Sequence, residues 1–285
     1  MNEGGSGSAW RAFWNRGGWW RALLLVVVYL ALYLGAGWVG EKLFGDQIQA
    51  SMFSTAGSVF AAVTWSLIVG AILLTGFLLS VGWFRPLFAR QPLGGRWWMW
   101  IAPALIVITL VMRYVGIDYS VYPGGAIAMT LVTGLFIGFV EEVLTRGIVV
   151  KMLRDAGTSE WLVMLGSALA FGLMHSVNLL SGMSLLVVGI TVLFAFGFGI
   201  LMYVTLRVTG NLIWPILLHA LYDPTLFLST GGIDVASAKA QSVLVTLAGS
   251  ANIVFIIAAF LLIPAVIVSD RLAAGRSAQE VVAPG

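Results

Sequence analysis

Long apolar stretches separated by short polar segments make up most of the chain. A helix that crosses a membrane needs about 20 mostly apolar residues. Eight stretches meet that length: 21–40, 56–83, 98–117, 125–150, 160–180, 183–206, 210–229 and 243–268. The segments between them are too short to hold a soluble domain. The pattern predicts an all-α polytopic membrane protein, with about eight transmembrane helices in a single domain over residues 21–270.

The two ends of the chain differ from this pattern. The first residues are rich in glycine and serine, and tryptophans and arginines follow before the first apolar stretch. Tryptophan beside arginine is typical of a membrane–water boundary. We therefore predict a disordered and interfacial segment over residues 1–20 and a flexible tail over residues 271–285.

The composition supports a membrane protein. Of the 285 residues, 60% are hydrophobic and 9% are charged, whereas soluble domains average about 25% charged residues. A water-soluble enzyme and an intrinsically disordered chain are therefore excluded. The net charge of +3 does not indicate a nucleic-acid partner, because the basic residues lie in short clusters beside apolar stretches. We predict a multi-pass integral membrane protein in the lipid bilayer, in the cell membrane if the source is bacterial.

Basic residues collect at one end of the predicted spans. If the N-terminus is cytoplasmic, only Lys42 and Lys239 lie in loops on the opposite side. The basic residues on the cytoplasmic side are then Arg11, Arg16, Arg21, Arg85, Arg90, Arg96, Lys151, Arg154, Arg207, Arg271 and Arg276. Cytoplasmic loops carry an excess of lysine and arginine, so we predict that both the N- and C-termini are cytoplasmic.

Ionisable side chains remain inside three of the predicted spans. They are Glu141, Glu142, Arg146, His175, His219 and Asp223. A charged group at the bilayer centre costs on the order of 2.5–3.5 kcal/mol on insertion scales. We therefore expect these side chains to meet in one polar cavity, with Asn178 and Asn211 as supporting polar residues.

The spacing of these residues indicates which of them share a helix face. Glu142 and Arg146 are four apart and can pair, whereas Glu141 points about 100° away toward a different neighbour. His219 and Asp223 are also four apart. The alternative interpretation of the Glu142–Arg146 pair is purely structural, an ion pair that locks the helix bundle.

The backbone near these residues is expected to be irregular. Pro215 cannot donate a backbone hydrogen bond, so a kink is predicted there, and Pro224 biases Asp223 away from helical geometry. Gly134 and Gly138 provide a face of small residues that allows a neighbouring helix to approach closely.

Carboxylates and imidazoles in a pocket of low dielectric constant can catalyse hydrolysis. A glutamate can take a proton from water, and imidazole or amide groups can stabilise a tetrahedral oxyanion. Alternatively, Glu141, His175 and His219 could hold a divalent metal such as Zn²⁺ that activates the water. The sequence has no HExxH motif, so the usual zinc-helix pattern of metalloproteases is absent. Both a metal-free site and a metal site remain open at this point.

Three motifs in order resemble a known family. Glu141-Glu142-Val-Leu-Thr-Arg146 matches EExxxR, Phe171-Gly-Leu-Met-His175 matches FxxxH, and His219-Ala-Leu-Tyr-Asp223 resembles HxxxN. Together they resemble the CPBP family of intramembrane proteases, which includes CAAX proteases, bacteriocin-processing enzymes and abortive-infection proteins. The resemblance covers about residues 125–230.

The resemblance implies an intramembrane endopeptidase that acts on a peptide or membrane-protein substrate. By carry-over, Glu141 with His175 would activate the water, and His219 with the residue at 223 would stabilise the oxyanion. Arg146 would pair with Glu142 and fix the site. The family is often described as metalloproteases, which again leaves the metal open. The chain departs from the family at Asp223, because an ionised aspartate only accepts hydrogen bonds where an asparagine would donate them.

Two other functions are compatible with the same polar residues. A bacteriocin-immunity or peptide-binding membrane protein could use the cavity without catalysis. A proton-coupled transporter also places acidic and histidine side chains inside the membrane, although no inverted repeat of broken helices is evident in the sequence.

Overall fold

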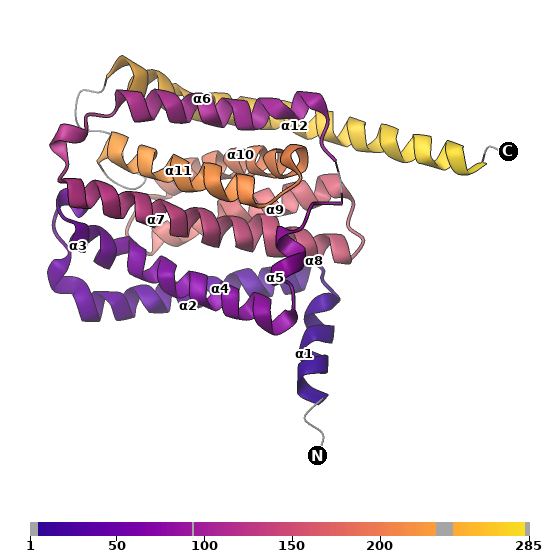
Figure 1. Ribbon diagram of the computed structural model, residues 1–285, viewed down its shortest axis with the longest axis horizontal. Coiled ribbons are helices and arrows are strands. Elements are labelled where there is room, and N and C mark those ends of the chain that lie inside the picture. Colours follow the sequence, from indigo (N-terminus) through magenta and orange to yellow (C-terminus); the bar gives the residue numbers. More distant parts are fainter. Residues whose placement is uncertain (1–4, 93, 232–241, 283–285) are drawn as a thin grey trace.

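The computed structural model describes residues 5–92, 94–231 and 242–282. Within these ranges the secondary structure is entirely helical, which confirms the all-α prediction. Long helices pack side by side along the length of the molecule (Figure 1). They are α2 (Trp19–Phe44), α4 (Trp65–Val81), α6 (Ile101–Gly116), α7 (Gly124–Glu142), α9 (Glu160–Met174), α10 (Leu185–Thr209), α11 (Ile213–Thr230) and α12 (Val243–Val282).

Shorter helical pieces connect or extend the long helices. The α-helical ones are α1 (Gly5–Asn15), α3 (Ala56–Val59), α5 (Phe84–Phe88) and α8 (Val150–Asp155). Two segments have the wider turns of a π-helix, η3 (Phe60–Thr64) and η6 (Val143–Val149). Tight 3₁₀ turns form η1 (Gly45–Gln47), η2 (Met52–Ser54), η4 (Trp97–Trp100), η5 (Tyr119–Val121) and η7 (His175–Leu179).

In the described part of the chain, seven helical segments are long and apolar enough to cross a membrane. They are Trp19–Gln47, Ala56–Val81, Trp97–Gly116, Gly124–Asp155, Glu160–Leu179, Leu185–Thr209 and Val243–Leu272. The prediction of a polytopic membrane protein is thereby confirmed. The eighth predicted span, 210–229, is not among them, although helix α11 forms there. Its polar side chains and two prolines make α11 less apolar than the seven candidate spans.

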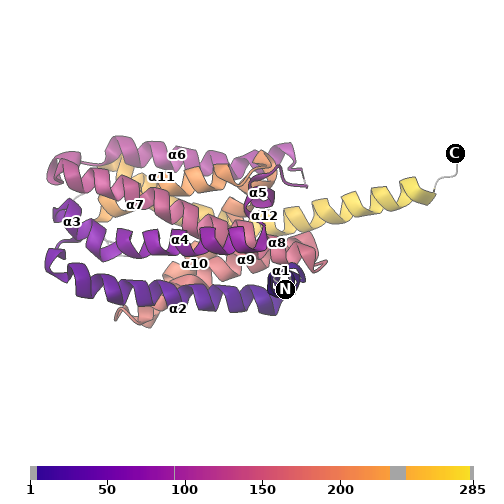
Figure 2. The ribbon, with the colours of Figure 1, turned by 60° about the horizontal axis from the view of Figure 1, so that its bottom comes forward.

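Helix α11 nevertheless lies within the bundle beside α7 and α6 (Figures 1 and 2). Its 18 residues correspond to about 27 Å at 1.5 Å per residue, close to the thickness of the hydrocarbon core. Both described ends of the chain lie at the same end of the bundle (Figure 1), which requires an even number of crossings. The cytoplasmic location of that end stays a prediction, and Lys239 lies outside the described residues.

The two ends of the chain are more regular than predicted. Residues 5–15 form helix α1, which is attached to the end of α4 because Trp10 Nε1 donates to Ser80 Oγ at 3.0 Å and Arg11 Nε donates to the Ser80 carbonyl at 3.1 Å. At the other end, α12 continues as a helix to Val282 and projects beyond the bundle (Figure 2). Helical structure therefore extends into both segments, and the flexibility of the tail stays a prediction. Residues 1–4 and 283–285 lie outside them.

Close packing of α7 on α11 sets the position of the polar residues. A Cβ atom added at Gly134 would collide with the Ala220 carbonyl oxygen, and one added at Gly138 would collide with the Ile216 carbonyl oxygen. The close approach predicted from the two glycines is therefore confirmed. It brings the C-terminal end of α7 against the helix that carries His219.

The expected backbone irregularities of α11 are not observed. Pro215 lies in the first turn of the helix, where its missing N–H leaves no hydrogen bond unmade and no kink follows. Pro224 lies inside the helix, and Asp223 keeps a helical conformation because α11 continues to Thr230. Tyr114 of α6 donates a hydrogen bond to the carbonyl of Leu221 at 3.2 Å, close to Pro224.

Candidate active site

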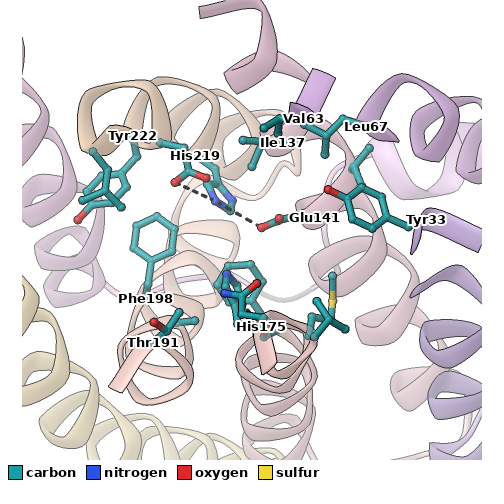
Figure 3. A pocket seen from close by; sticks show the side chains of 18 of the residues that line it. Tyr33, Val63, Leu67, Ile137, Glu141, His175, Thr191, Phe198, His219 and Tyr222 are labelled. Carbon is teal, nitrogen blue, oxygen red and sulfur yellow. Dashed lines mark hydrogen bonds and ion pairs between the residues drawn. The ribbon is translucent and has the colours of Figure 1, made fainter. Parts of the chain in front are cut away.

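A cavity of about 190 Å³ lies between α2, α4, α7, α9, α10 and α11. Five of the predicted site residues line it: Glu141, His175, Asn178, His219 and Asp223. Figure 3 shows the Glu141, His175 and His219 side chains pointing into the same space from three different elements. The expected convergence of three polar spans is therefore what the structure contains. Most other wall residues are apolar or aromatic.

Glu142, His219 and Arg146 form a buried group directly behind the cavity. The His219 Nδ1 atom lies 2.8 Å from Glu142 Oε1, and Arg146 Nη1 lies 3.2 Å from the same oxygen. The side chains of Glu142 and Arg146 are 0% exposed. An ionised carboxylate only accepts hydrogen bonds. His219 Nδ1 therefore carries a proton and donates a hydrogen bond to Glu142. The predicted Glu142–Arg146 pair is present, and it also holds the imidazole.

Glu141 occupies a different environment from its sequence neighbour. Its carboxylate is 21% exposed, and its Oε2 atom lies 3.7 Å from His219 Nε2. Asp223 approaches the same nitrogen from its own helix, with Oδ1 at 3.6 Å and the side chain 19% exposed. The outer nitrogen of His219 therefore faces the cavity between two carboxylates. A positive charge on this ring would be stabilised by both of them.

His175 reaches the cavity because α9 ends there. The helix stops at Met174, and His175 begins the 3₁₀ turn η7. His175 Nδ1 lies 3.0 Å from the carbonyl oxygen of Phe171, which can only accept a hydrogen bond. Nδ1 therefore carries the proton, and Nε2 of the neutral ring keeps a lone pair that can accept one.

The two predicted supporting asparagines have different locations. Asn178, three residues after His175, lines the cavity as the spacing predicted. Asn211 does not belong to the site. Its Nδ2 atom donates to the Phe88 carbonyl at 3.2 Å, and its Oδ1 atom accepts from the Ile213 backbone N–H at 2.8 Å. These contacts cap the start of α11 and connect it to α5, so the supporting role predicted for Asn211 is structural.

A widened helical turn follows the two glutamates. The buried π-helical segment η6 continues α7 directly after Glu142, and single π-turns occur frequently at functional sites. Thr145 Oγ1 donates to the Glu141 carbonyl at 2.6 Å, and Ser167 Oγ donates to the Thr145 carbonyl at 3.0 Å. Arg146 Nη1 also donates to Thr145 Oγ1, at 2.5 Å. These side chains satisfy backbone groups in the turn and fix the direction of Arg146.

Aromatic rings enclose both histidines. The Phe171 ring lies 5.2 Å from the His175 ring and 5.6 Å from the His219 ring, both edge to face. Phe198 lies 5.1 Å from His219 in the same manner. The Arg146 guanidinium lies over the Phe171 ring, 4.3 Å from its centroid. Both rings pack against the imidazoles, which the motif spacing alone does not predict.

The site does not offer a metal-binding ligand set. In the ranges 5–92, 94–231 and 242–282, no group of three or more His, Cys, Asp or Glu side chains is arranged to hold a metal ion. The predicted ligand set of Glu141, His175 and His219 therefore has no support from the described residues.

Comparison with known proteins supports the family resemblance. Residues 123–225 match the family model described as type II CAAX prenyl endopeptidase Rce1-like. No curated protein and no solved structure matches the chain. The matched segment contains all the cavity-lining site residues from Glu141 to Asp223. The resemblance to CPBP-type intramembrane proteases is thereby confirmed over residues 123–225.

Proposed function

We propose that this chain is an intramembrane endopeptidase that hydrolyses a peptide bond with a water molecule activated at Glu141. One observation supports this most directly. Of two adjacent glutamates, Glu142 is fully buried and bound to Arg146 and His219, whereas Glu141 is open to the cavity beside the other nitrogen of His219. A carboxylate with space for water and an imidazole at its side is what general-base hydrolysis requires.

The reaction follows from these positions. Glu141 takes a proton from a water molecule, and the resulting hydroxide attacks the carbonyl carbon of the peptide bond. The carbonyl oxygen becomes an oxyanion, which accepts a hydrogen bond from Nε2–H of His219 in its doubly protonated form. The tetrahedral intermediate then collapses, the C–N bond breaks, and Glu141 returns its proton to the leaving amine. His175, with its free Nε2 lone pair, orients the attacking water.

The remaining polar residues act through His219. Glu142 fixes its ring through Nδ1, and Arg146 balances the charge of Glu142. Asp223 cannot donate a hydrogen bond to the oxyanion when ionised. Its position 3.6 Å from Nε2 instead allows it to stabilise the positive charge of the imidazolium. We therefore assign Asp223 a positioning role rather than a direct contact with the substrate.

The substrate is a peptide or a membrane-associated protein segment. The wall of the cavity around the polar groups is mostly apolar, which accommodates apolar side chains next to the bond that is cleaved. A bilayer location of the cavity also selects substrates that reach the membrane.

The test compares wild type with Glu141→Gln and His219→Ala in lipid vesicles. The probe is a library of quenched fluorescent peptides that carry an apolar membrane anchor. Glu41→Gln is the matched control, because Glu41 is exposed near the end of α2 and does not line the cavity. We expect cleavage by wild type and Glu41→Gln and none by the other two variants. Cleavage by all four proteins would contradict the proposal. Peptide binding by all four without any cleavage would favour the peptide-binding function instead.

A further inference from the structure

Part of the cavity wall comes from outside the segment that matches the family model. Helix α2, which precedes residues 123–225 by a long stretch of chain, contributes Tyr29, Leu30 and Tyr33. Val63 and Leu67 complete this wall from η3 and α4. Among these five residues, only the two tyrosines carry a polar side-chain group.

The two tyrosines lie four residues apart and their rings stack, with centroids 6.2 Å apart and planes at 26°. Their hydroxyl groups are in different places. Tyr29 is 5% exposed, its hydroxyl group is buried, and it packs so closely on Gly70 that a Cβ atom there would collide with it. Tyr33 is less buried, and Figure 3 shows its hydroxyl group directed across the cavity toward Glu141.

Glu141 has room for such a partner. The His219 Nε2 atom lies 3.7 Å from Glu141 Oε2, which is beyond hydrogen-bond distance. Within the described part of the chain, no side chain donates a hydrogen bond to this carboxylate. The Tyr33 side chain and Glu141 line the same cavity, and a phenylalanine would fill the same wall equally well. The hydroxyl group itself is therefore unexplained by packing.

We propose that Tyr33 is a positioning residue of the active site, whose hydroxyl group donates a hydrogen bond to the Glu141 carboxylate. This inference rests on the proposed function. The hydrogen bond holds the carboxylate toward the attacking water and leaves its second oxygen free to take the proton. Catalytic hydrogen bonds are often long in the absence of substrate and tighten when it binds. The N-terminal span is then part of the catalytic machinery and not only a wall of the bundle.

The first test uses Tyr33→Phe, with Tyr119→Phe as the control, because Tyr119 lies in η5 and does not line the cavity. Each change removes one hydroxyl group and keeps the ring. We expect Tyr33→Phe to lower kcat by about tenfold or more, the loss expected for a hydrogen bond to a charged group, with KM and the melting temperature unchanged. Tyr119→Phe should leave kcat unchanged. Equal kcat values for wild type and Tyr33→Phe would overturn the inference, and so would an equal loss in both variants.

The second test does not depend on activity. 3-Fluorotyrosine is placed at position 33 or at position 119 of the full chain in detergent, and the ¹⁹F NMR signal is compared with and without Glu141→Gln. A shift at position 33 that is absent at position 119 supports the contact, and an unchanged signal at position 33 refutes it. If wild type cleaves no peptide, the proposed function fails, and the ¹⁹F result still decides whether Tyr33 binds Glu141.

Discussion

His219 Nδ1 lies 2.8 Å from Glu142 Oε1, an oxygen that also lies 3.2 Å from Arg146 Nη1. One buried carboxylate thus binds two cationic or proton-donating groups from two helices. The preceding carboxylate along the chain, Glu141, faces the cavity instead. Consecutive glutamates on a helix point in different directions, and the proposed function assigns a structural role to Glu142 and a catalytic role to Glu141.

The different roles of Glu141 and Glu142 predict different effects when each is replaced by alanine. Glu142→Ala leaves the Arg146 charge buried without its partner, which costs on the order of 3–5 kcal/mol of stability and lowers the melting temperature. Glu141→Ala removes a partly exposed carboxylate that accepts no side-chain hydrogen bond from the described residues, so we expect no loss of stability but a loss of cleavage. Thermal unfolding in detergent and peptide cleavage measure the two effects. An equal fall in melting temperature for both variants would contradict the assignment.

Asp223 offers a test of whether His219 needs a negative charge beside it. Its Oδ1 atom lies 3.6 Å from His219 Nε2, and Asp223→Asn keeps an oxygen acceptor for this nitrogen but removes the charge. We therefore expect Asp223→Asn to lower activity and Asp223→Leu, of similar size, to lower it further, by about a hundredfold, a typical loss for one group that supports the oxyanion. Initial cleavage rates under saturating peptide distinguish them. An Asp223→Asn variant as active as wild type would contradict the charge-stabilising role of Asp223.

The contact of α7 with α11 should tolerate no side chain at Gly138. An alanine there places a Cβ atom within 3.0 Å of backbone atoms of Ala220, and overpacking of this kind costs about 1–3 kcal/mol. Gly189 is the matched control, because it also lies inside a helix and nothing lies within 4 Å of an added Cβ. We expect Gly138→Ala to lower both the melting temperature and the activity. Gly189→Ala should keep or raise stability, since alanine favours helices. A Gly138→Ala variant as stable as wild type would refute this account of the packing.

The sequence predicts the spans and the identity of most site residues for a physical reason. Apolar length marks a span, and the cost of ionisable groups inside a membrane forces Glu141, His175 and His219 together. The rotation of each helix is less accessible. Spacing predicted the Glu142–Arg146 pair, but only the packing of α7 on α11 shows that Glu142 also holds His219.

Two differences between the sequence-based prediction and the structure have physical explanations as well. The sequence predicts Asn211 as a supporting site residue because it is polar and lies beside a span, yet a polar residue at a helix start is often a cap. The sequence does not indicate the contribution of α2, because Tyr29 and Tyr33 look like ordinary aromatic residues in an apolar stretch. Their place at the cavity depends on tertiary packing between segments distant in the sequence.

The orientation of the bundle remains a prediction from the basic residues, and the chain is well suited to test it because it contains no cysteine. Single cysteines can therefore be introduced without background and labelled with a maleimide that does not cross membranes. Arg90 and Ala156 are exposed in loops at the end of the bundle where the chain begins. Cysteines at these positions should react only when the cytoplasmic side is accessible, because loops rich in arginine stay inside.

The opposite end of the bundle completes the test and decides whether α11 crosses. Asp46, Ser120 and Val243 are exposed and follow an odd number of crossings if α11 is the seventh. Cysteines there should react from the outside in intact cells. Labelling at Asp46 and Ser120 from outside but at Val243 only from inside would mean that α11 does not cross the membrane. His219 would then sit in a helix that enters and leaves on one side, and the even number of crossings would be wrong.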